Sequence, residues 1–108
     1  PLDVLVQVNI DAQASKSGCM PGEVAALCEA IAMLPVLRLR GLMAIPAAHA
    51  DPRDARPSLR AMRALFDATQ RVHPAIDTLS MGMSDDLEVA IEEGATLVRV
   101  GTAIFGAR

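Results

Sequence analysis

Two short loops of small residues in the second half of the sequence have the composition of a phosphate-binding site. Residues 80–84 read SMGMS, and Gly101 with Thr102 opens a second loop. Glycine lets a backbone N–H approach an anion, and serine and threonine add hydroxyl donors, so two such loops side by side could surround a phosphate. The same residues also suit two ordinary turns with a helix cap, because small-residue loops are common after parallel strands.

Arg99 interrupts the apolar run 97–100 just before the second loop. Alternation along a strand puts Arg99 on one face with Leu97 and Gly101, and the two valines on the other. A guanidinium keeps its charge when buried, so it needs an anionic or hydrogen-bonding partner. We favour a ligand-binding role for Arg99 over a structural ion pair with an acid elsewhere in the protein.

Other residues able to do chemistry lie in the first half and in the loops. Asn9 follows an apolar run and can either face the site or form an Asx turn that ends the strand. Lys16 is the only lysine. It lies in a polar loop rather than on an apolar strand, which favours a surface lysine over a Schiff-base catalyst. His49 and His73 lack metal-ligand spacing, so no metal site is expected.

The overall composition predicts an aliphatic core and excludes several classes of protein. Of 108 residues, 52% are hydrophobic, 21% charged and 2% aromatic, with a net charge of −3. The hydrophobic fraction excludes disorder, no apolar run reaches the ~20 residues of a membrane span, and the charge excludes a general grip on nucleic acid. Cys19 and Cys28 are too few for a disulfide framework, so a reducing, cytoplasmic location is expected.

Hydrophobic spacing divides the chain into four strands that alternate with three helices. Apolar runs predict strands over residues 2–10, 37–45, 76–79 and 97–100. Helical spacing predicts helices over residues 23–34, 58–73 and 84–93, with Ser58 and Ser84 as N-caps. This order is typical of a parallel α/β sheet, in which ligands bind at the carboxyl ends of the strands.

The boundaries of this pattern suggest part of a larger fold. Residues 1–108 form a single unit without an internal boundary, but the unit begins inside a strand and ends just after one. A sheet cut in this way leaves bare edges, which natural proteins usually cover. We therefore expect a fragment, the second half (strands five to eight) of a TIM-type (β/α)8 barrel, which typically needs about 250 residues.

Three blocks of the sequence together resemble the pyridoxal phosphate homeostasis protein family (YggS/PROSC type). They are VNIDAQASKSG (8–18), LRLRGLMAIP (37–46) and the block 76–108, in which SMGMSDD and RVGTAIFG are the most specific parts. The resemblance covers essentially the whole chain and is poorest over residues 47–56. It implies a barrel like the N-terminal domain of alanine racemase, with this chain as its C-terminal half.

The resemblance also implies a cofactor, pyridoxal 5′-phosphate (PLP), and a role in controlling its free level and supply, without a robust catalytic activity. Possible partners are PLP-dependent apo-enzymes and the N-terminal half of the barrel, and the lysine that forms a Schiff base with PLP is expected upstream of Pro1. Arg99 would lie near the pyridine nitrogen. The residues implied to bind the cofactor are Ser80, Met81, Gly82, Arg99, Gly101, Thr102, Met43 and Asn9, with the loop 15–18 near the site.

Two other functions stay open at the level of the sequence. The first is a PLP-dependent racemase, which needs a second acid/base group, often a tyrosine, whereas this sequence contains no Tyr. An arginine beside the pyridine nitrogen disfavours its protonation and makes the ring a weaker electron sink, which suits a carrier better than a transaminase. It does not exclude racemisation, because the related racemase fold also places an arginine there. The second is another barrel enzyme that binds a phosphate-bearing ligand.

Overall fold

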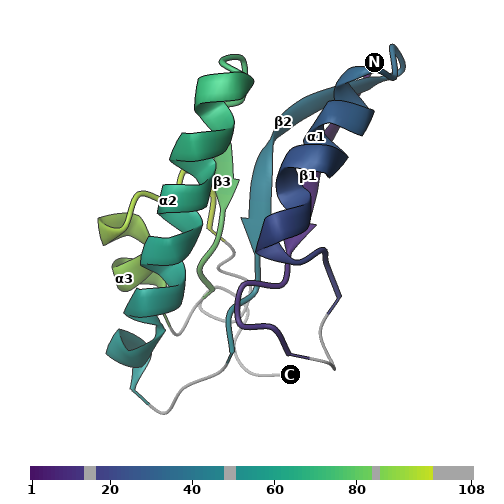
Figure 1. Ribbon diagram of the computed structural model, residues 1–108. Helices are drawn as coiled ribbons and strands as arrows, with labels where there is room; N and C mark the ends of the chain where they lie inside the picture. The colour runs from purple at the N-terminus through teal and green to yellow at the C-terminus, as the bar shows by residue number, and fades with distance from the viewer. Residues whose placement is uncertain (14–16, 48–50, 84–85, 99–108) are drawn as a thin grey trace, which may run out of the picture.

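A small parallel sheet with helices on one face forms the centre of the molecule. The computed structural model describes residues 1–13, 17–47, 51–83 and 86–98. Strands β1 (Leu2–Val8), β2 (Leu37–Ala44) and β3 (Thr78–Ser80) form a three-stranded sheet in the order β1-β2-β3, and both pairings are parallel. In Figure 1, helices α1 (Val24–Ala32) and α2 (Arg56–Val72) lie over the same face of the sheet, and α3 (Leu87–Glu92) lies beside α2.

The two faces of the sheet differ in burial, as the alternation along the strands requires. Val6 and Val8 of β1 and Leu42 of β2 are buried against the helices. The opposite face carries residues such as Leu5 and Gln7, which are only half-buried. The buried hydrophobic core consists of Val6, Val8, Val24, Cys28, Leu42, Ala44, Ala55, Leu59, Met62, Phe66, Ile76, Leu79, Met81, Val89 and Ala90.

Helix α2 begins earlier than predicted, at a proline-containing turn. The 3-10 turn Pro52–Ala55 leads directly into the helix at Arg56, and the Asp51 carboxylate accepts a hydrogen bond from the Arg53 N–H at 2.9 Å. The prediction of an N-cap at Ser58 is therefore wrong, because Pro57 suits the first turn of a helix and Ser58 already lies inside it. The helix ends at Val72, close to the predicted end.

Strands β2 and β3 approach each other closely at a glycine. The β1–β2 register shifts between Val4 and Leu5, so Arg40 is an extra residue on β2, and Gly41 then pairs with Thr78. A Cβ atom added to Gly41 would lie 1.7 Å from the Thr78 carbonyl oxygen. The sheet can close at this point only because residue 41 has no side chain.

The predicted second half of a (β/α)8 barrel, with strands five to eight, is wrong. The described residues form a small, three-stranded parallel sheet with helices instead. Leu97 contributes only an isolated bridge to Ser80, and the Thr96 hydroxyl accepts a hydrogen bond from the Leu79 N–H at 2.7 Å. The rest of the predicted fourth strand, residues 99–100, lies outside the described residues. The local sequence pattern predicted the three strands of this sheet and the helices between them, but not how many strands join one sheet.

Candidate functional site

The carboxyl ends of the three strands bring two predicted site residues into one row. The strand register places Gln7 opposite Met43 and Met43 opposite Ser80. Residues in register on parallel strands share a face, and this is the face that the helices leave uncovered. Ser80 is 3% exposed and Met43 is half-buried.

Gln7 belongs to this row, although sequence analysis did not propose it. It is half-buried, and its side-chain amide donates to the Ser17 carbonyl oxygen at 3.5 Å, a long contact. The signal that could have found it is alternation, since Gln7 is the one polar residue between Val6 and Val8.

Met81 and Gly82, which follow β3, are held in place by burial, a backbone hydrogen bond and the conformation of the glycine. Met81 is fully buried in the core, and its N–H donates to the Leu97 carbonyl oxygen at 3.1 Å. Gly82 has φ +94°, in the left-handed region, and a Cβ there would lie 2.3 Å from the Ala90 Cβ. In the described part of the chain, no group accepts a hydrogen bond from the Gly82 N–H. Met81 thus anchors the segment, and Gly82 provides a backbone donor in a tight space.

Asn9 closes the loop after β1 through contacts with Gln13, four residues on, instead of the two residues of the Asx turn that the sequence allowed. Its side-chain amide donates to the Gln13 carbonyl oxygen at 2.8 Å, and its Oδ1 accepts from the Gln13 N–H at 3.1 Å. Its own N–H donates to the Cys19 carbonyl oxygen at 2.8 Å. Asn9 therefore shapes the loop after β1.

Asp11 joins two of the loops at the carboxyl edge of the sheet. Its carboxylate accepts from the Ala47 N–H at 2.6 Å and from the Ser58 hydroxyl. These contacts connect the loop after β1 to the loop after β2 and to the first turn of α2. Sequence analysis did not propose Asp11, because its partners lie far away along the chain and no local sequence pattern marks the contacts.

The remaining predicted site residues lie outside the described residues. They are Arg99, Gly101 and Thr102. Lys16, His49 and the predicted N-cap Ser84 also lie outside the described residues. Within the described ranges, no group of three or more His, Cys, Asp or Glu side chains could hold a metal ion.

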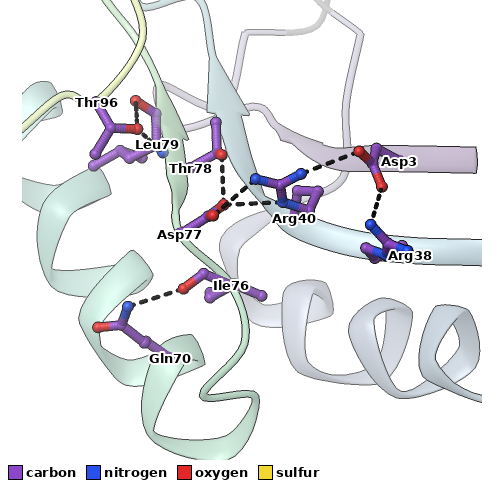
Figure 2. A network of polar contacts seen from close by, with 9 residues as sticks. All are labelled: Asp3, Arg38, Arg40, Gln70, Ile76, Asp77, Thr78, Leu79 and Thr96. Carbon is purple, nitrogen blue, oxygen red and sulfur yellow. Dashed lines mark hydrogen bonds and ion pairs between the residues drawn. The ribbon is translucent and has the colours of Figure 1, made fainter.

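An ion network crosses the opposite, amino-terminal edge of the sheet (Figure 2). The Arg40 guanidinium donates to both Asp77 carboxylate oxygens, at 3.0 and 2.7 Å, and to Asp3 at 3.1 Å. These contacts, led by the hydrogen bonds to Asp77, raise the pKa of Arg40, and the Arg40 hydrogen bonds lower the pKa of Asp77. Since the network lies at the other end of the strands, we interpret it as structural.

The two cysteines are free thiols in different environments. Cys28 is fully buried in α1, and Cys19 is half-buried in the loop before it. Burial is the main cause that raises the pKa of each thiol, which makes both poor nucleophiles at neutral pH.

None of the helices in the described chain has the length and apolar character needed to span a membrane.

The chain belongs to the family described as "Alanine racemase, N-terminal domain", whose family model matches residues 1–108. This match to an N-terminal domain corrects the prediction that the chain is the C-terminal half of the barrel.

Curated relatives identify a narrower group within this family and confirm the resemblance found in the sequence. Proteins named "Pyridoxal phosphate homeostasis protein" match the whole chain, at 55% identity in Pseudomonas aeruginosa and 53% in Escherichia coli K12. The chain covers 46% of each, so it spans about half the length of these relatives.

Solved structures show the same fold. An unknown protein from Bifidobacterium adolescentis is 39% identical with a TM-score of 0.87, and the match covers 95% of this chain and 42% of that one. PipY of Synechococcus elongatus PCC7942 with PLP bound is 29% identical with a TM-score of 0.80, covering 96% of this chain and 49% of PipY.

Proposed function

We propose that the protein binds PLP and acts in PLP homeostasis, as a carrier or regulator of cofactor supply. The observation that carries the proposal is the identity of more than half the residues with proteins named for this role. The PLP-bound PipY structure, whose fold this chain shares, supports the choice of cofactor.

The residues at the carboxyl edge fit the phosphate end of PLP. Ser80 ends β3, and the Gly82 N–H has no acceptor in the described chain. Backbone N–H groups near a glycine are suitable donors to a phosphate oxyanion. Met43 and Gln7, in register with Ser80, would contact the ring of the cofactor. Gly101, Thr102 and Asn9 complete the proposed set.

Arg99 supports a carrier over a transaminase. PLP, when bound, supplies a reactive aldehyde and an electron-withdrawing ring. An arginine beside the pyridine nitrogen repels a proton at that atom, so the ring would stabilise carbanions less. The two free cysteines favour a reducing compartment, and we place the protein in the cytoplasm.

A titration of the protein at its full natural length with PLP and with pyridoxal, which lacks the phosphate, tests the proposal. We expect saturable PLP binding, observed as an absorbance change, and weaker binding of pyridoxal. Ser80→Ala should weaken PLP binding about tenfold, the size of one hydrogen bond to a charged group, and leave pyridoxal binding nearly unchanged. Equal affinity for the two ligands would contradict the phosphate site.

The racemase alternative is supported by the family itself, since the matching family model is that of an alanine racemase domain. It is tested by incubating the PLP-loaded protein with L-alanine and measuring D-alanine. The carrier function predicts no turnover above the rate of free PLP, and sustained racemisation would favour the enzyme.

A further inference from the structure

Helix α3 is too short to hold its own position. It has six residues, Leu87–Glu92, and isolated helices shorter than ~12–15 residues are marginal in water. Its inner side is buried at Val89 and Ala90. Its location must therefore depend on contacts with the rest of the protein, and Figure 1 shows α2 alongside it.

An ion cluster joins the end of α3 to the first turns of α2. Arg56 donates to Glu92 and to Glu93, each at 2.6 Å, through different guanidinium nitrogens. Arg60 donates to the second Glu93 oxygen at 3.2 Å. We call Arg56, Arg60, Glu92 and Glu93 the α2–α3 ion cluster.

The position of Glu93 within the cluster makes it more than a surface charge. Its side chain is 13% exposed, while the side chains of Glu92 and Arg60 are 60% and 68% exposed. Exposed ion pairs contribute little to the stability of a protein. The Glu93 carboxylate is shielded and has two arginine partners, so solvent screens it less and its hydrogen bonds hold a defined geometry. Arg63 adds a hydrogen bond to the Gly94 carbonyl oxygen at 3.1 Å.

The other side of α3 touches the segment proposed to bind phosphate. Ala90 lies against Gly82, where a Cβ would approach the Ala90 Cβ to 2.3 Å. A contact this close means that a shift of α3 would move the Gly82 backbone or open a gap beside it. The ion cluster and the Gly82 N–H are therefore linked through one short helix.

We propose that Glu93 and Arg56 are positioning residues for phosphate recognition, because they fix α3 and through Ala90 set the place of the Gly82 N–H. The proposal rests on the proposed PLP-binding function and extends it to residues that do not touch the ligand. Both residues act on the phosphate end of the ligand, so their loss should change the preference for PLP over pyridoxal.

The test is the ratio of PLP affinity to pyridoxal affinity in the full-length protein, with Glu93→Gln as the main variant. This variant keeps the shape of the side chain and removes its charge. We expect PLP binding to weaken about fivefold, a fraction of one charge-assisted hydrogen bond, with pyridoxal binding unchanged. Arg56→Lys, which keeps the charge but cannot bridge two carboxylates in the same way, should give the same change in smaller measure.

Glu29→Gln is the matched control, since it makes the same chemical change in α1, where the Glu29 carboxylate pairs with His73 at 3.5 Å and lies outside the α2–α3 ion cluster. It should leave the affinity ratio unchanged. An unchanged ratio in Glu93→Gln, or equal weakening of both ligands, would overturn the positioning role while PLP binding by the native protein stands. A native protein that binds neither PLP nor inorganic phosphate would overturn the proposed function, and this inference with it.

Discussion

Gly41 and Thr78 are packed so closely that their strands leave no room for a methyl group between them. A Cβ on residue 41 would lie 1.7 Å from the Thr78 carbonyl oxygen, well inside van der Waals contact. The contact holds β3 against β2 and sets the register that aligns Met43 with Ser80. The proposed site therefore depends on a glycine that would not contact the ligand.

Gly41→Ala should destabilise the protein by about 3 kcal/mol or more, because the strands must separate to admit the methyl group. Urea unfolding followed by circular dichroism measures this change. Gly22→Ala is the control, since no atom lies within 4 Å of the Cβ position there, and it should change stability by less than about 0.5 kcal/mol. If the two variants lost the same amount of stability, the close contact between β2 and β3 at Gly41 would not be the cause of the effect.

Asp11→Asn should destabilise the protein by about 1 kcal/mol, because an amide can replace only one of the two acceptor oxygens used by Ala47 and Ser58. Hydrogen exchange at the Ala47 amide should become faster. Asp54→Asn, at an exposed position of the 3-10 turn, is the control. Unchanged exchange at Ala47 in the Asp11 variant would rule out this connection between the loops.

The contact between Arg40 and Asp77 predicts a specific pH dependence of stability. The Arg40 hydrogen bonds lower the pKa of Asp77 below its ordinary value of 3.8, so the unfolded chain binds its proton at a higher pH than the folded one. The contribution of Asp77 is therefore fully present above that value and is lost as the pH falls through the lowered pKa.

Asp77→Asn should flatten the loss of stability below about pH 3.8, measured by urea unfolding at several pH values. Since these groups are exposed, high ionic strength should reduce the difference between the variant and the native protein. Parallel stability curves for the two proteins would contradict the assignment.

The two thiols should differ in their rates of alkylation. Cys28 is 0% exposed and Cys19 half-buried, so iodoacetamide should modify Cys19 at least about tenfold faster in the folded protein. Both should react at similar rates in denaturant, which is the control. Faster labelling of Cys28 in the native state would show that α1 opens readily.

Periodicity in the sequence was enough to place most of the elements. An apolar run predicted β1, although the strand ends at Val8 and not at Ile10, and helical spacing predicted the buried face of α2 at Leu59, Met62 and Phe66. These patterns are local, because each reports only which side of its own element is buried.

The features that depend on distant partners could not be predicted in this way. The contact of Asp11 with Ser58 and that of Arg56 with Glu93 join residues far apart in the sequence. The number of strands in the sheet is also a property of the whole fold, which explains why the predicted barrel half was wrong, while the parallel order of the first three predicted strands was confirmed. The predicted binding role of Ser80 and Gly82 stays a prediction.

The most direct test of the central claim is the NMR signal of the Gly82 amide in the full-length protein during titration with PLP. The account predicts a saturable shift of this signal, with the same dissociation constant as the absorbance change, and a smaller shift with pyridoxal. Saturation of the absorbance change without any movement of the Gly82 signal would contradict it, because the phosphate would then be bound elsewhere.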